Sequence, residues 1–312
     1  MVSDRRALLL TVISVLLVPA SAAAWCPTLT EGPPQPADFS ACAPMLDRLP
    51  LRWHRRCSSI SLSASAASHA LSPAQVTSVL RRSLDVWQNA DCGGSTTGLE
   101  VTILAETNAC TVATHNTNGR NVHSLIFIGD ADVWSRVREH DLRAFAVTYV
   151  WHERTTGEIL DVDMEINEAR GVLQDCPAAG CMDCPPEGCG GASGGPVDFG
   201  NVLTHELGHY FGLSHTTSDH RDATMFAQAP FGEIIKRDLT ADDIDAICTT
   251  YPPGTLPASC DTTPSGGLGL DCQSGACGCA APGADHRGST GLAGTALALG
   301  MALARRRRMS KR

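Results

Sequence analysis

Three histidines and a glutamate at fixed spacing could hold a metal ion beside a general base. His205 and His209 lie four positions apart, so on a helix of about 3.6 residues per turn their imidazoles share one face. Glu206 follows the first of them, and His215 comes after the second, beyond Gly212. We expect the glycine to end the helix in a left-handed conformation, so that His215 can join the other two. Three imidazoles leave one zinc coordination position for water, which is typical of a catalytic site.

Such a site would carry out hydrolysis. Zinc lowers the pKa of a coordinated water to about 7, and Glu206 is placed to take its proton as general base and to pass it to a leaving amine. Unrelated histidines on a surface helix are the alternative interpretation. The glycine and the third histidine at their fixed offsets argue against it.

Residues 205–215, followed by Met225, resemble the zinc-binding sequence and the Met-turn of the metzincin metalloproteases. The resemblance implies that His205, His209 and His215 bind zinc and that Met225 forms a floor beneath the metal without being a ligand. It also implies a protein or peptide as substrate.

Two flanking segments narrow the resemblance to the matrixins. Arg52 and Trp53 precede a helix that should begin at Pro73, with Ser72 as its N-cap, and that carries Trp87 near its end. This order is similar to the opening of the matrixin catalytic domain. Residues 239–252 are similar to its last helix.

The predicted elements define an α+β fold. In the closing helix, Thr240 is the expected N-cap, and Asp242 and Asp243 complement the positive helix start. Alternating or continuous apolar runs predict a first strand from residues 51–53 and 59–62, and further strands at residues 99–104, 125–128, 144–151 and 159–166. Residues 51–252 are therefore expected to form a metzincin catalytic domain with a twisted mixed sheet, an active-site zinc helix, a Met-turn and a C-terminal helix.

Two of these strands have expected roles. By resemblance, residues 144–151 border the cleft and pair with an extended substrate. Asp161, Asp163 and Glu165 alternate along the next strand. They could bind calcium, an ion that matrixins often carry, although a plain solvated strand face is the favoured interpretation. The spacing of the matrixin structural zinc loop is not recognisable, so no second zinc is assigned.

The composition indicates which kinds of partner the protein can bind and which cellular compartment it occupies. The chain has 312 residues, a net charge of −9 and 14 cysteines. The acidic balance argues against nucleic acid as a partner, and we expect a monomer.

Twelve cysteines are available for disulfides in an exported protein, with Cys277 and Cys279 left near the end. Their pairing stays open, and for Cys176, Cys181, Cys184 and Cys189 a disulfide-stapled loop is favoured over a four-thiolate zinc site.

The two ends of the chain predict export. Residues 1–24 have the parts of a secretory signal peptide, with cleavage expected near Trp25 and an uncleaved anchor as the alternative. Residues 25–50 are a short Pro-rich extension and 253–288 an extended linker. Residues 289–312 combine an apolar segment with an arginine cluster, which predicts a membrane-inserted helix. This tail resembles the C-terminal sorting tail of exported myxobacterial proteins, and a basic disordered tail is the alternative.

The pattern departs from other metzincins at Thr216 and Phe226, which leaves the matrixins as the best assignment. The cysteine-switch motif of matrixin prodomains is not found, so we predict no thiol-controlled latency. The chain is thus predicted to be an exported zinc metalloendopeptidase, at the cell surface or extracellular. The alternative is a surface adhesin or binding module that keeps the fold without turnover.

Overall fold

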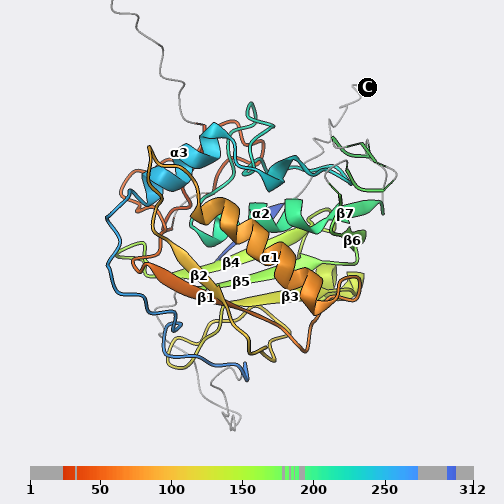
Figure 1. Cartoon of the computed structure of the whole chain (residues 1–312), viewed down its shortest axis with the longest axis horizontal. Coiled ribbons are helices and arrows are strands. Elements are labelled where there is room, and N and C mark those ends of the chain that lie inside the picture. Colours follow the sequence, from red (N-terminus) through yellow and green to blue (C-terminus); the bar gives the residue numbers. More distant parts are fainter. Residues whose placement is uncertain are drawn as a thin grey trace, which may run out of the picture.

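The computed structural model describes residues 24–31, 34–177, 180–182, 184–185, 187–189, 194–272 and 294–299. Its main element is a mixed sheet with the strand order β2-β1-β3-β5-β4-β8 (Figure 1). The first four strands in this order pair in parallel, whereas β4 pairs antiparallel with both of its neighbours. This arrangement confirms the predicted α+β class and the mixed sheet.

The strands follow the predicted apolar runs closely. They are β1 (Cys57–Leu62), β2 (Glu100–Ile103), β3 (Ser124–Ile128), β4 (Ala146–His152), β5 (Ile159–Asn167) and β8 (Gly294–Leu299), with a separate pair β6 (Val172–Gln174) and β7 (Pro196–Asp198). Residues 51–53, expected as part of the first strand, make only an isolated bridge from Arg52 to Glu158. Both faces of β3 are buried: Leu125 and Phe127 join the larger core, and Ile126 joins a smaller one on the other face.

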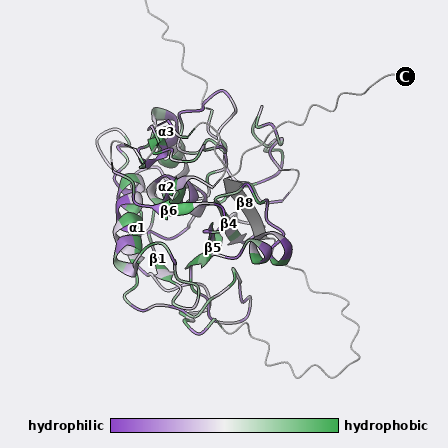
Figure 2. Cartoon of the chain, turned by 90° about the vertical axis from the view of Figure 1, so that its right-hand side faces the viewer, coloured by the Kyte–Doolittle hydropathy of each residue, from purple (hydrophilic) through white to green (hydrophobic). Residues whose placement is uncertain are grey.

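In the described ranges, three helices and two short helical turns accompany the sheet. They are α1 (Pro73–Gln88), α2 (Phe199–Tyr210), α3 (Ala241–Thr250), the π-helical turn η1 (Val133–Val137) and the 3-10 turn η2 (Ile235–Arg237). Ser72 and Thr240 cap α1 and α3 as predicted, each in a reciprocal capping box. The helix α2 lies between α1 and β4 (Figure 2).

Two tryptophans fix α2 against the rest of the core. Trp87 of α1 donates its indole N–H to the Thr204 carbonyl at 2.8 Å. Trp53 donates to the Tyr210 carbonyl at 2.9 Å, at the far end of the helix. Both indoles are fully buried, so each donor satisfies a backbone acceptor that has no access to water. The helix is thereby fixed at two points along its length.

Six disulfides pair all twelve cysteines of the even set. They join Cys26 to Cys42, Cys57 to Cys260, Cys92 to Cys248, Cys110 to Cys272, Cys176 to Cys181, and Cys184 to Cys189. The predicted disulfide-stapled loop at residues 176–189 is confirmed, in place of a four-thiolate site. Cys277 and Cys279 lie outside the described residues.

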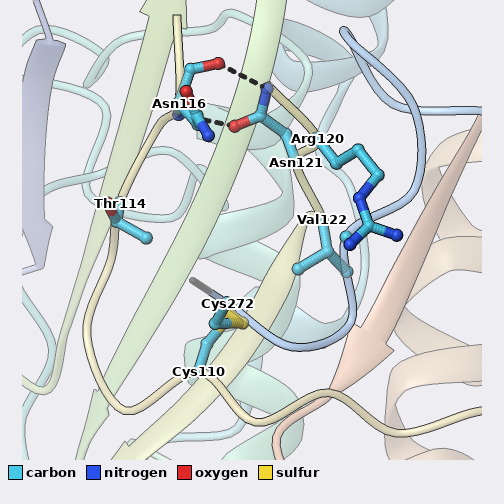
Figure 3. Close-up of a pocket in the computed structure, with 8 residues that line it drawn as sticks. Cys110, Thr114, Asn116, Arg120, Asn121, Val122 and Cys272 are labelled. Atoms are coloured by element: carbon cyan, nitrogen blue, oxygen red, sulfur yellow. Dashed lines mark hydrogen bonds between the residues drawn. A yellow bond between two sulfur atoms is a disulfide. The ribbon is translucent and has the colours of Figure 1, made fainter. Parts of the chain in front are cut away.

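Residues 253–272, the described part of the expected linker, run along the domain without a helix or strand and are attached to it. Leu268 and Leu270 contact the smaller core, and the disulfide to Cys110 holds the end of the segment. Asn121 donates to the Ser265 carbonyl at 2.8 Å and exchanges hydrogen bonds with Asn116, beside a small pocket (Figure 3). Non-local disulfides decide this placement, and composition alone does not reveal them.

The apolar C-terminal segment is not helical where the structure describes it. Residues 294–299 form β8, which pairs with β4 in the register Thr148 to Leu297. The predicted membrane helix is wrong for these six residues, because a short apolar strand can satisfy its backbone groups on an open sheet edge. Among the described residues, no helix is long and apolar enough to cross a membrane. The predicted signal peptide, the arginine cluster and the rest of the tail fall outside the described residues, apart from Ala24.

Candidate metal centre

The helix α2 delivers two of the three predicted ligands. Asp198 caps its start by accepting from the Asn201 amide at 2.7 Å. After the helix, Gly212 has a φ of +87°, and a Cβ there would overlap the Leu51 carbonyl oxygen. Glycine is therefore required at this turn, as predicted, and the turn brings His215 back toward the helix.

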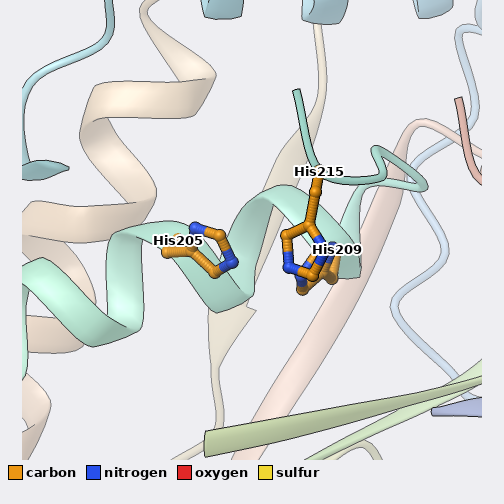
Figure 4. A group of neighbouring side chains, drawn as sticks. All are labelled: His205, His209 and His215. Atoms are coloured by element: carbon orange, nitrogen blue, oxygen red, sulfur yellow. The ribbon is translucent and has the colours of Figure 1, made fainter. Parts of the chain in front are cut away.

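The three histidines converge. His205 and His209 project from α2 and His215 from the segment after it (Figure 4). Their ring centroids are 4.8, 5.2 and 4.8 Å apart, and one nitrogen from each ring lies within 4.8 Å of the others. Such a cluster of imidazole nitrogens suits zinc and related transition metals.

Hydrogen bonds set the tautomers of two of these rings. Nδ1 of His205 lies 2.6 Å from the Thr224 carbonyl, and Nδ1 of His209 lies 2.8 Å from the Leu213 carbonyl. A carbonyl can only accept, so each Nδ1 carries the proton and each Nε2 keeps its lone pair. The Nε2 atoms of His205, His209 and His215 are buried, and none has a hydrogen-bond partner in the part of the chain that the structure describes. Buried polar atoms are rarely left unpaired, so these three nitrogens fit a metal ion as their missing partner.

Burial keeps the histidines neutral. It lowers the pKa of His209 to about 4. It also lowers the pKa of His205 and of His215, and the neighbouring imidazoles lower both further. A neutral imidazole is the form that binds a metal, so the site is ready for a cation at neutral pH.

Glu206 lies in the same buried region with one oxygen engaged and one free. Its Oε2 accepts from the Thr148 hydroxyl at 2.6 Å, and its Oε1 has no partner among the described residues. Burial raises the pKa of this carboxyl to about 8, although the hydrogen bond from Thr148 lowers it. A carboxylate with a raised pKa is a stronger base than a solvated one.

Met225 packs directly against α2. A Cβ at Gly208 would overlap its sulfur and lie 2.9 Å from its Cε. Asp243 of α3 holds the turn from below, because its carboxylate accepts from the Thr224 amide at 2.8 Å and from the Met225 amide at 3.0 Å. The predicted Met-turn thus lies under α2, and Asp243 anchors it in addition to capping α3.

The N-terminal extension reaches the third ligand, a contact the sequence did not predict. Gln35 donates to the His215 carbonyl at 3.0 Å, and the Phe39 ring meets the His215 ring edge-on at 5.0 Å. The Cys26–Cys42 disulfide closes this segment. Its two cysteines were visible in the sequence, but nothing there showed which surface the closed loop covers.

The acidic face of β5 is not solvated, which corrects the favoured interpretation. Asp161, Asp163 and Glu165 are fully buried. Asp161 contacts the Nδ1 atoms of His115 and His123 at 3.0 and 2.6 Å. Asp163 accepts two backbone amides at 2.7 and 2.8 Å. Because protein donors already meet these oxygens, the structure lends no support to calcium at Asp161 and Asp163.

Comparison with known proteins agrees with this geometry. No curated protein matches the chain. Residues 104–252 match the family model of the matrixins, peptidase family M10, a range that contains all three histidines, Glu206 and Met225. The family implies zinc, and the histidine cluster offers a site for it. The match supports a matrixin-like metzincin domain, with a metalloprotease-type function, in this chain.

Proposed function

We propose that the chain is an exported zinc-dependent metalloendopeptidase. One observation carries the proposal: in one short stretch of chain, three imidazole Nε2 atoms and one carboxylate oxygen of Glu206 are buried and lack hydrogen-bond partners among the described residues. The histidines have the chemistry of zinc ligands, and the carboxylate has that of a general base. His205, His209 and His215 would hold the ion, which supplies a more acidic water and a Lewis acid for the peptide carbonyl.

Glu206 is the proposed general base. Its free Oε1 takes a proton from the attacking water, and the same oxygen then gives that proton to the leaving amine. Burial raises the pKa of this carboxyl, and a cation held by the three histidines would favour its ionised form, which is the form that accepts a proton. Met225 stays beneath the site as packing and takes no part in proton transfer.

The proposed substrate is a protein or peptide in extended form. Strand β4 contacts α2 through the bond from Thr148 to Glu206, so an extended chain that takes the place of β8 on the edge of β4 would run past the site. Main-chain pairing of this kind binds many sequences, because backbone groups are common to all of them.

Export is the proposed setting. The six disulfides indicate an extracellular or secreted protein, since such bonds persist in oxidising compartments. Cleavage of residues 1–24 as a signal peptide and sorting through the C-terminal tail stay predictions. N-terminal sequencing of the exported chain would test the first of them.

The test is cleavage of a denatured protein by the exported, purified chain. We expect a strong chelator to abolish cleavage and stoichiometric zinc to restore it. His215→Ala should lose zinc affinity and activity together, whereas His220→Ala, at a half-exposed histidine outside the cluster, serves as the matched control. Undiminished cleavage after the chelator has removed the metal would contradict the proposal. Tight zinc binding without any cleavage would instead favour the catalytically silent binding module.

A further inference from the structure

Thr148 and Glu206 meet across two elements that are far apart in the chain. Thr148 lies on β4 and Glu206 on α2, 58 positions apart in the chain. The Thr148 Oγ1 donates to the Glu206 Oε2 at 2.6 Å, and both side chains are fully buried. This is the single protein contact to the carboxylate among the described residues, since Oε1 has none.

The donor is held rigidly. Strand β4 is paired along its length with β5, where Thr148 lies opposite Met164, and this pairing does not involve the edge that a substrate would occupy. Threonine is β-branched, so its χ1 has few allowed values and the hydroxyl occupies a restricted position. Glu206, by contrast, has a flexible side chain that loses conformational freedom when one orientation is imposed. The Thr148 hydroxyl therefore determines the orientation of the Glu206 carboxylate, whereas the carboxylate does not determine the position of the hydroxyl.

The bond is compatible with both protonation states of the base. When the carboxylate takes a proton on Oε1, Oε2 remains a carbonyl oxygen and still accepts from Thr148. The contact can persist while the proton arrives and while it leaves. The donated hydrogen bond also stabilises negative charge on Oε2, which makes this oxygen less basic than Oε1.

We propose that Thr148 is a positioning residue for the general base, which it fixes through Oε2 so that Oε1 alone exchanges the proton. This inference rests on the proposed peptidase function. It adds a residue on the sheet, outside the zinc-binding sequence, to the groups on which turnover depends. The simple alternative is that the hydroxyl only satisfies a buried acceptor and contributes to folding.

The experiment compares Thr148→Val, which keeps the shape and removes the hydroxyl, with Thr148→Ser, which keeps the hydroxyl. We expect Thr148→Val to lower kcat by about 10- to 100-fold, the loss typical for a hydrogen bond to a charged group, with KM nearly unchanged. Thr148→Ser should restore most of kcat. Zinc affinity, measured by competition with a chromogenic chelator, should be the same in all three proteins, because the hydroxyl contacts no histidine of the cluster.

Thr204→Val provides a matched control on the zinc helix. It removes another buried hydroxyl, which bonds to Ser83 at 2.9 Å and to the Gly200 carbonyl, and it should reduce stability while leaving kcat near the wild-type value. The proposal is overturned if Thr148→Val retains wild-type kcat. It is also overturned if zinc affinity and stability fall in parallel with kcat and serine does not rescue. A zinc-loaded wild-type chain that cleaves nothing would overturn the proposed function and this inference together.

Discussion

The close approach of Met225 to the zinc helix predicts a specific coupling between two positions. Gly208→Ala would place a methyl group over the Met225 sulfur, 2.9 Å from its Cε and 3.0 Å from Trp87 Cζ2. On an open helix the same change is stabilising by about 1 kcal/mol. Within a closed core, overpacking costs about 1 to 3 kcal/mol, so the net effect here should be destabilising or close to zero.

The matched background is Met225→Val, which lacks both the sulfur and Cε. In that background the added methyl loses its main obstacle, and Gly208→Ala should become neutral or stabilising. The expected coupling free energy is about 1 to 3 kcal/mol. The coupling is measured by urea unfolding of the wild type, the two single mutants and the double mutant. All four proteins are zinc-free, so that metal binding does not contribute to the measured stabilities. Equal effects of Gly208→Ala in both backgrounds, or a stabilised single mutant, would refute the packing argument.

Three further outcomes are expected. Replacing Cys57 and Cys260 by serine should lower the free energy of unfolding by up to about 5 kcal/mol, since the bridge spans 203 positions; an unchanged urea midpoint would contradict this. In the zinc-free protein, burial lowers the pKa of His209 to about 4 from 6.5, so between these values the unfolded chain binds the proton that the folded chain excludes. The buried Glu206 carboxyl, whose pKa is raised to about 8, titrates with the opposite sign, so the test uses the Glu206→Gln background. There stability should fall by about 3 kcal/mol as the pH drops through this window, and a flat urea midpoint from pH 7 to pH 4 would be inconsistent with it. Removing residues 273–312 frees the β4 edge from β8, so kcat/KM for an unfolded protein should rise; an unaltered value would show that β8 does not compete with substrate.

Local signals predicted much of the fold and the site. The caps at Ser72 and Thr240, the left-handed Gly212 and the convergence of the histidines follow from residue types at fixed offsets. The strands followed from apolar runs, to within a few residues. These features depend on neighbours in the chain, which a single sequence displays.

Contacts between segments that are far apart in the chain could not be predicted from the sequence. The bond from Thr148 to Glu206 and the anchoring of Met225 by Asp243 each join separate elements. On β5, alternation of acidic and apolar residues is typical of a solvated face, yet His115, His123 and nearby backbone amides cover Asp161 and Asp163. Periodicity shows which residues share a face, but it does not show what packs against that face.

The most direct test of the central claim is kcat of Glu206→Gln at full zinc occupancy. Glutamine keeps an acceptor for Thr148 and nearly the same shape, but it cannot take the proton from water. We predict one zinc per chain, as in the wild type, and a loss of about 10²- to 10⁴-fold in kcat. Wild-type turnover in the zinc-loaded variant would contradict the assignment of Glu206 as general base.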